Sequence, residues 1–580
     1  THLNVQNSTF TSCNPIDPAW YIKSDQMKFD YQNSQGSARN PVMYFESVPI
    51  FAAPYMSFPL GQRKSGFLTP NFGGSSTAGT MFSEPYYWNM APNYDMTITP
   101  EFWTQQGLMV TDKFRYMSES NVGSIYTEQL AINTGAPEID TPNYRWYWSL
   151  NDLYSPMKYL TMGYNYNQVS DGNYFNDFGN FYSVTDNVNL DQSIFVNYKP
   201  TWGLASVKLQ AYQTLFPDGT AQTVSIYSQY PQINFNVNPQ DIGGGFKGAL
   251  TSQYTDFYSP SMQSGQREVF YPSITYPMQS AWGYVKPKVG YNVTEYQLGL
   301  NPGYPASNGS QQIALPITSV DSGLYFDRPL SSSMGSAYTQ TFEPRLYYLY
   351  IPQQDQSQIP LFDTATATYN YAQLFNENRF SGFDRINSAN DITIGGTTRF
   401  INDTTGAELM NLSIGYRYFI TPENDFLYGN QTQDAQLFLP SPNLITELNN
   451  NWSKTISTTA SFQYDTTYSV IDAYTANIKW NPDDGKVINL GFNYQYDLPL
   501  LFYASTPGQA FTPTSYENQY AITVSEQWPI YENKIYAISS ANYDFTRQML
   551  LNVVGGAQYN GGCYTISAVY QQYIFNYNQT

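Results

Sequence analysis

The residue types that most often carry out catalysis or bind metal are scarce in this chain of 580 residues. It contains one histidine, His2, and two cysteines, Cys13 and Cys563. Histidine is the commonest general base and metal ligand, and cysteine serves as a nucleophile or a zinc ligand. Ser-His-Asp triads and histidine-rich zinc sites both need histidine, so a single histidine near the N-terminus makes either kind of site improbable here. We therefore predict no catalytic residue, no metal site and no cofactor.

The two cysteines lie near opposite ends of the sequence and form no C-x-x-C motif. Redox and zinc sites of that type are therefore excluded. Two alternatives remain open from the residues alone. Either both thiols are free, or they form a disulfide, which would place the protein in an oxidising compartment.

Composition excludes two further classes. The chain has 26 Lys and Arg against 45 Asp and Glu, for a net charge of −19, so it is no nucleic-acid binder with a basic face. Aromatic residues make up 17% and charged residues only 12%, which is the opposite of a disordered composition. The sequence also lacks a G-x-x-x-x-G-K-[ST] nucleotide-binding loop.

Most of the chain alternates between apolar and polar residues with a period of two, as β-strands do. Ile488, Leu490 and Phe492, for example, alternate with Asn489 and Gly491. Turn-forming residues separate such segments, and we find no long stretch of helical periodicity. The sequence predicts an all-β protein. Further segments of this kind are 412–420, 476–481 and 564–571.

Two architectures could hold so many alternating strands: a soluble sandwich or propeller, or a transmembrane barrel with an apolar outer face and a polar lumen. The polar faces carry too many amides for a dry core, and aromatic residues cluster at strand ends, as in 85–88 and 144–148. No linker divides the chain, although a single soluble core rarely exceeds about 250–300 residues. A barrel over residues 62–580, at about 20 residues per strand, predicts about 26 strands.

Residues 1–61 differ from the rest, with short strands followed by Pro41, Pro49, Pro54 and Pro59. We interpret them as the end of a small soluble β domain whose beginning is missing, because strands starting so abruptly would have unpaired edges.

Several strings resemble the LptD family of lipopolysaccharide-assembly proteins. Three of them are similar to the junction between jellyroll and barrel in that family, and the others to its mid-barrel motifs. Between about Tyr116 and Tyr284 the chain matches only in strand character. The strings are 48–55, 63–70 and 85–95 for the junction, and 343–350, 370–375, 378–385 and 395–400 for the barrel.

The resemblance implies a large antiparallel barrel in the bacterial outer membrane (62–580), preceded by the C-terminal part of a periplasmic jellyroll (1–61). It implies a translocon for lipopolysaccharide and no enzyme. The jellyroll would receive lipopolysaccharide from periplasmic bridge proteins. An LptE-type lipoprotein would plug the lumen, and cargo would enter the outer leaflet through a lateral gate between the first and last strands.

Four residues would make that gate easy to open. Pro70 falls in the expected first strand, 65–75, and Pro85 in the expected second, 81–89. Proline removes a backbone donor from the ladder, and Gly73 and Gly74 weaken the same strand. The alternative for each proline is a bulge or a strand end.

Two other features follow from the resemblance. Pro49, Pro54 and Pro59 would set the angle between jellyroll and barrel. The family has two disulfides from its periplasmic domain to adjacent cysteines late in the barrel. Here Gly562 precedes Cys563, so we predict one bridge, Cys13–Cys563.

Other functions remain open at this stage: a plugged nutrient receptor or porin-type barrel, a barrel enzyme, and an adhesin. The acidic charge also has two explanations. The acids either face external loops, where divalent cations bridge them, or line the lumen and keep it from retaining an anionic substrate. Arg63-Lys64 and Lys286-Pro287-Lys288 form no anion site that spacing alone would support.

Overall fold

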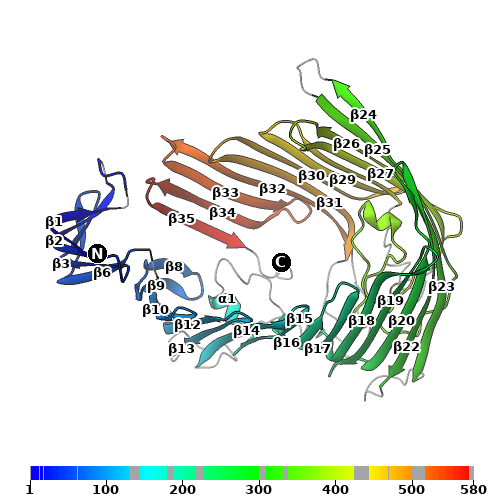
Figure 1. Cartoon of the computed structure of the whole chain (residues 1–580), viewed down its shortest axis with the longest axis horizontal. Coiled ribbons are helices and arrows are strands. Elements are labelled where there is room, and N and C mark those ends of the chain that lie inside the picture. The colour runs from blue at the N-terminus through cyan, green and yellow to red at the C-terminus, as the bar shows by residue number, and fades with distance from the viewer. Residues whose placement is uncertain are drawn as a thin grey trace.

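The computed structural model shows a small N-terminal sheet beside a large sheet that curves into a ring (Figure 1). It describes residues 2–573 apart from 12, 17, 62, 131–143, 179–188, 216–225, 261, 300–308, 332–336, 423–426, 428–442, 468 and 500–515. Within these residues the fold is almost entirely β, as predicted. No helix among them is long and apolar enough to cross a membrane.

The N-terminal sheet has six antiparallel strands in the order β5-β4-β2-β3-β6, with β1 paired to β2. Ile22, Met27 and Ala38 form its small core, and Phe10 and Phe58 pack against them. The strands are β1 (His2–Phe10), β2 (Trp20–Asp30), β3 (Gln35–Arg39), β4 (Val42–Phe45), β5 (Val48–Ala52) and β6 (Tyr55–Pro59).

The large sheet contains 29 strands, and β10 to β35 follow one another in chain order. Its first half comprises β7 (Gly66–Phe67), β8 (Asn71–Ser75), β9 (Gly79–Ser83), β10 (Tyr86–Ala91), β11 (Tyr94–Trp103), β12 (Gly107–Met117), β13 (Asn121–Leu130), β14 (Arg145–Met157), β15 (Leu160–Val169), β16 (Asn189–Tyr198), β17 (Gly203–Thr214), β18 (Ser228–Gly243), β19 (Phe246–Tyr258), β20 (Gly265–Thr275) and β21 (Met278–Ser280).

The second half comprises β22 (Gly283–Leu298), β23 (Ser310–Leu324), β24 (Phe326–Ser331), β25 (Ala337–Ile351), β26 (Ala389–Asn402), β27 (Glu408–Phe419), β28 (Leu444–Asn451), β29 (Ile456–Asp465), β30 (Val470–Asp483), β31 (Lys486–Pro499), β32 (Tyr516–Tyr531), β33 (Ile535–Asp544), β34 (Met549–Asn560) and β35 (Thr565–Tyr573). Some neighbours, such as β20 and β21, are two segments of one interrupted strand that share the partner β22. The number of passes is therefore smaller than 29 and close to the expected value.

The alternation places polar residues inside the ring and apolar residues outside it. Along β26, Asp391 and Thr393 are buried whereas Ile394 is 59% exposed. A soluble protein would bury the isoleucine, so this inversion is the pattern of a membrane barrel.

Connections differ between the two ends of the barrel. At the end where β34 turns into β35, turns are short, as at 92–93, 158–159, 484–485 and 561–564. At the far end they are longer, as at 170–188, 352–388 and 420–443. Short turns on one side and long loops on the other are typical of outer-membrane barrels.

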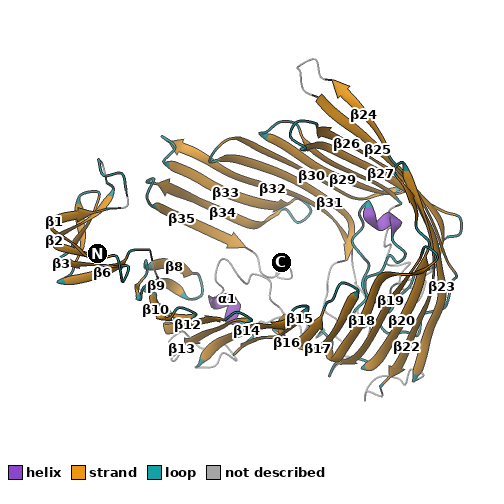
Figure 2. Ribbon diagram, in the orientation of Figure 1, coloured by secondary structure: helices purple, strands orange, loops and turns teal. Residues whose placement is uncertain are grey.

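Two of the long connections fold back into the ring. One carries the helix α1 (Tyr174–Phe178) and the other the 3₁₀ helix η1 (Ala372–Phe375). Figure 2 shows both helices, in purple, inside the curve of the strands. We call them the α1 loop (170–178) and the η1 loop (352–388).

Candidate functional site

The barrel begins with interrupted strands. The expected first strand, 65–75, is in fact two segments, β7 and β8, with Pro70 between them. The expected second strand, 81–89, is likewise divided into β9 and β10, with Pro85 between them. Both expectations of a continuous strand were therefore wrong, because proline cannot donate to the ladder and its ring constrains the backbone.

The two interruptions lie side by side. Phe67 pairs with Tyr86 on one side of the break, and Asn71 pairs with Ser83 on the other. Between them, the backbone N–H of Leu68 donates to the carbonyl oxygen of Pro85 at 2.8 Å. Each proline thus occupies a strand end, which was the alternative interpretation of its position, and its role in a gate stays a prediction.

The two glycines of β8 have different surroundings. A Cβ on Gly74 would lie 2.7 Å from the carbonyl oxygen of Gly79, whereas a Cβ on Gly73 would come no nearer than 3.4 Å to Met81. Position 74 therefore needs glycine for the close approach of β9, and position 73 tolerates a side chain.

The first and last strands of the barrel meet at a weak junction. The strand order brings β35 next to β7, which is only two residues long. Among the described residues of this region, registers are defined for β7 with β10, β8 with β9, β9 with β11, β10 with β11, and β34 with β35. We call the segment from β7 to β10, together with β35, the seam.

The α1 loop supports the seam from inside the barrel. Arg145, 1% exposed, donates to Asp171 at 2.8 Å and to Asp177 at 2.6 Å. The hydroxyl of Ser75, at the tip of β8, donates to the backbone oxygen of Asp177 at 3.3 Å. Ala78 is fully buried in an apolar cluster that includes Phe178 of α1.

Tyr174 of α1 holds the loop to the wall. Burial, together with the carboxylate of Glu128, raises the pKa of Tyr174, so its hydroxyl stays protonated and donates to Glu128 at 2.7 Å.

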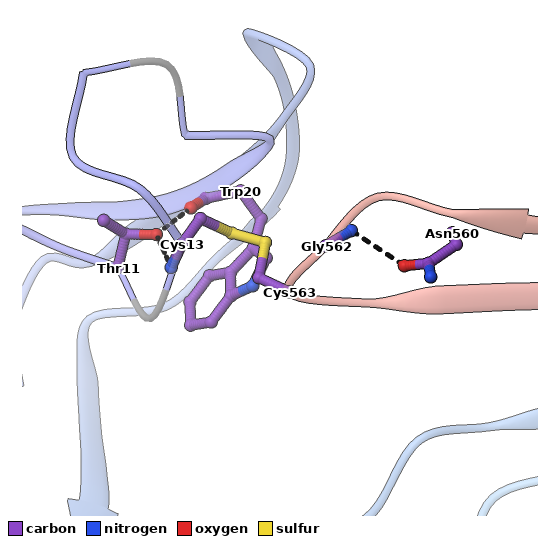
Figure 3. Close-up of a disulfide and its surroundings, with 6 residues drawn as sticks. All are labelled: Thr11, Cys13, Trp20, Asn560, Gly562 and Cys563. Carbon is purple, nitrogen blue, oxygen red and sulfur yellow. Dashed lines mark hydrogen bonds between the residues drawn. A yellow bond between two sulfur atoms is a disulfide. The ribbon is translucent and has the colours of Figure 1, made fainter. Parts of the chain in front are cut away.

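A disulfide joins Cys13 to Cys563, with the Cα atoms 5.1 Å apart (Figure 3). This confirms the predicted pair and excludes the free-thiol alternative. On the N-terminal side, the backbone N–H of Cys13 donates to the Thr11 hydroxyl at 3.0 Å. On the barrel side, Gly562 has φ +80° in the turn between β34 and β35, a conformation that favours glycine over a second cysteine.

The same turn makes a second contact with the N-terminal sheet. The rings of Phe45 and Tyr564 meet edge to face, with centroids 5.1 Å apart. Burial, a hydrogen bond with Tyr559 and the nearby Glu46 carboxylate raise the pKa of Tyr564 to about 12. Tyr564 lies in the turn, outside the membrane-spanning strands.

The three prolines predicted to set the angle between the domains occupy different places. Pro49 lies within β5, opposite Tyr44, and Pro54 lies between β5 and β6. Pro59 is the last residue of β6 and therefore borders the link to β7. A role for all three in the angle stays a prediction, and the position of Pro59 suits it best.

The wall opposite the seam holds the η1 loop with buried charges. Arg267 of β20 is fully buried and donates to Asp363 and Asp384, both at 2.6 Å. Asp384 is also fully buried, and its other oxygen accepts the backbone N–H of Phe362 at 2.8 Å. Arg385 donates to the backbone oxygens of Ile359 and Leu427.

Close packing completes this attachment. Leu374 and Phe375 of η1 are buried in an apolar cluster with strand residues such as Tyr347. Glycines of the wall make room for them, since a Cβ on Gly395 would lie 2.7 Å from the ring of Phe375.

The segments 378–385 and 395–400 carried the family resemblance, but the sequence did not predict their contacts. It also did not predict the ion pairs of Arg145, Arg267 and Asp363. Charge was the available signal, because an arginine within a barrel strand needs a partner. Among the described residues, no group of three or more His, Cys, Asp or Glu side chains could hold a metal ion.

Comparisons with known proteins agree with this architecture. A family model described as LptD, LPS transport system D, matches residues 143–534, and a second, LptD protein, matches residues 38–242. Together these matches include the whole region between Tyr116 and Tyr284, where the sequence by itself showed only strand character. The resemblance there is thus wider than expected.

Curated relatives are similar along nearly the whole chain. An LPS-assembly protein LptD from Chromobacterium violaceum is 37% identical over 98% of this chain and 69% of its own length. Proteins of the same name from Nitrosospira multiformis and Thiobacillus denitrificans are 33% and 32% identical, each over 98% of this chain. The chain spans 58% of the length of the Nitrosospira protein and 74% of the length of the Thiobacillus protein.

Proposed function

Because this chain belongs to the LptD family of LPS-assembly proteins, we propose that it is the outer-membrane translocon that inserts lipopolysaccharide into the outer leaflet. The family is one of transport and assembly proteins and not of enzymes. In this proposal the N-terminal sheet lies in the periplasm, and the disulfide end of the barrel faces it. The long loops of the far end then face the exterior.

The cargo would pass through a lateral gate at the seam. The N-terminal sheet receives lipopolysaccharide from periplasmic bridge proteins and delivers it to β7. The lipid part enters the membrane between β7 and β35, and the sugars pass through the lumen. An LptE-type lipoprotein occupies the remaining lumen.

The interrupted ladder of the seam is the observation that carries this proposal. A backbone hydrogen bond contributes about 0.5–1.5 kcal/mol net, so the energy needed to separate two strands grows with their paired length. β7, the neighbour of β35 across the gate, is only two residues long, whereas β22 and β23 pair continuously from Gly283 to Gln297. Separating strands at the seam therefore requires less energy than separating β22 from β23.

The porin-type alternative is disfavoured by the lumen. The α1 and η1 loops occupy space that a diffusion pore would leave to water, and buried ion pairs fix both of them. Such attachments suit a barrel whose wall must stay intact while one seam opens.

Photo-crosslinking in living cells tests the proposal. A photoreactive amino acid at Phe67, which is 73% exposed at the seam, should form adducts with lipopolysaccharide. The same probe at Ile394, 59% exposed on the opposite wall, is the matched control and should capture far less. Equal adducts at the two positions would show only contact with bulk lipid and would contradict the gate.

A further inference from the structure

A cavity of about 820 Å³ lies at the disulfide end of the barrel, beside the seam. Strands β11 to β16 and the segment before β7 line it, and the contributing residues include Arg63, Asp95, Arg115, Val122 and Leu153. This volume is in the range of sites for small molecules and lipid head groups, about 300–1,000 Å³.

The functional side chains of this cavity face the lumen. Trp103 of β11 packs against Phe178 of α1, inside the ring, with ring centroids 5.9 Å apart. Side chains alternate along a strand, so Asp95, eight positions away, points to the same side. Arg115 is paired with Asp95 across the ladder and shares that face.

Positive charge gathers at one end of the cavity. Asp95 is 3% exposed and accepts hydrogen bonds from Arg63 at 2.7 Å, Arg115 at 2.8 Å and the Tyr87 hydroxyl at 3.0 Å. The side chains of the two arginines are 49% and 52% exposed. One carboxylate for two guanidinium groups leaves a net positive charge, to which the exposed Lys113 on the same face of β12 adds.

The other end of the cavity is apolar. Met117 pairs with Val122, Val122 with Leu153, Leu153 with Gly163, and Gly163 with Phe195, so these residues form one row across five strands. Met117, Val122 and Leu153 are 62%, 48% and 41% exposed. The lumen of a membrane barrel is normally polar, so an exposed apolar row on this face favours an apolar ligand.

Acidic residues near the cavity do not cancel its charge. Asp152 contributes to the lining, but its position in β14 directs its side chain to the opposite face from Leu153, where it accepts from the Tyr116 hydroxyl. Asp191 lies on β16, four strands away from Arg115 on β12, and accepts hydrogen bonds from Asn165, Ser193 and Gln210.

We propose that this cavity binds a phosphorylated, acylated lipid on its way to the seam. A phosphate would bind Arg63 and Arg115, which offer planar guanidinium donors, and acyl chains would lie along the row from Met117 to Phe195. Arg63 lies three positions before Gly66, the first residue of β7, so bound cargo would be next to the seam. From there its acyl chains would leave the lumen between β7 and β35, while its sugars stay inside. The proposal rests on the proposed function and assigns a cargo site to it.

Charge and size favour a lipid over a protein plug. The chain as a whole is acidic, with a net charge of −19, so a local positive cluster beside an apolar row marks a place for an anionic amphiphile. The cavity volume of about 820 Å³ also suits a lipid head group, whereas a protein partner would need a broad surface.

The test uses the full chain, with the photoreactive residue at Val122 in cells and with purified protein in detergent. The purified protein is given diphosphorylated lipid A or its dephosphorylated form. The variant Arg63→Gln/Asp95→Asn/Arg115→Gln removes the charges without leaving a buried carboxylate unpaired. Arg328→Gln, an exposed arginine that donates to Gln340 in β25, is the matched control. Heat-dependent gel mobility shows that each variant is folded.

We expect lipopolysaccharide adducts at Val122, about tenfold weaker binding of lipid A by the triple variant, and the same loss when phosphate is removed from the lipid. Arg328→Gln should bind normally. Equal binding of both lipid forms, or a protein adduct at Val122, would overturn the proposal. If Val122 gives no lipid adduct while Phe67 does, the cargo site is wrong and the proposed function stands. If both positions are silent, both proposals fail.

Discussion

The seam and the wall opposite it are built from the same kind of strand, yet they are stabilised differently. The seam has interrupted strands, a two-residue first strand and solvent- or lipid-exposed aromatic side chains such as Phe67 and Phe72. The opposite wall has long continuous ladders and an inward loop fixed by the buried Arg267 and Asp384.

This difference shows how one sheet can contain both a fixed part and a part that is easy to separate. In the wall, separating any two strands would break a long ladder and expose buried charges, which is strongly unfavourable. At the seam, β9 and β10 pair with β11, the Cys13–Cys563 disulfide ties the β34–β35 turn to the N-terminal sheet, and the α1 loop contacts Ser75 of β8.

Replacing Arg267 with methionine should have the largest effect. The change leaves Asp363 and Asp384 without their cation, and removing one partner of a buried pair typically costs about 3–5 kcal/mol of stability. We expect a lower unfolding midpoint in detergent and faster proteolysis within the η1 loop.

Arg345→Met is the control on the same wall. Arg345 donates to Asp321, but their side chains are 32% and 20% exposed, so we expect a loss of about 0.2–1 kcal/mol. If both variants unfold at the same midpoint, burial of the charge is not what fixes the wall.

Removing the disulfide should have the next largest effect, and it should be confined to the N-terminal sheet and its attachment beside the seam. In Cys13→Ser/Cys563→Ser the N-terminal sheet loses its covalent link to the β34–β35 turn, and a disulfide typically contributes about 2–4 kcal/mol. We expect the N-terminal sheet to become protease-sensitive while the barrel keeps its heat-dependent gel mobility.

Electrophoresis with and without reductant supplies the check on that link. The native chain should change mobility when it is reduced, and the double serine variant should not. Maleimide labelling of both thiols in unreduced, denatured protein would contradict the bridge.

Restoring backbone donors at the seam should have a smaller effect of the opposite sign. Pro70→Thr/Pro85→Thr lets two more N–H groups join the ladder, which at about 0.5–1.5 kcal/mol each would hold the seam closed more firmly. We expect slower delivery of lipopolysaccharide to the cell surface and an unfolding midpoint that does not fall. Unchanged delivery would remove the gate role and leave the prolines as strand ends.

Much of the fold could be predicted because alternation is a local property. Ile488, Leu490 and Phe492 reveal an outward face without any knowledge of their neighbours, and the same reasoning gave an all-β barrel of about the right size. The disulfide was predictable only through the family resemblance, because nothing local links Cys13 to Cys563.

The interior could not be predicted in the same way. Arg267 and Asp384 meet across 117 positions of sequence, and alternation indicates which face a residue occupies but not which loop returns to cover it. The strand interruptions were only the alternative interpretation of the two prolines, for a different reason. Pro70 and Pro85 were recognised as weak points, but whether a proline bends a strand or ends it depends on its neighbours.

The smallest effect concerns the contact between Tyr564 and the N-terminal sheet, and it depends on pH. The pKa of Tyr564 is raised to about 12 in the folded protein, through burial and its neighbours Tyr559 and Glu46, against about 10 in an unfolded chain. Folding therefore favours the neutral phenol, and this contribution is complete below pH 10. It is lost as pH rises toward 12.

Tyr564→Phe keeps the ring contact with Phe45 but has no proton to lose. Between pH 10 and 12 the native N-terminal sheet should thus become protease-sensitive more steeply than that of the variant. Since the wall near Arg267 does not contact this turn, its unfolding should show no such difference. Parallel pH curves for the two proteins would mean that ring packing and the disulfide alone hold the sheet to the seam.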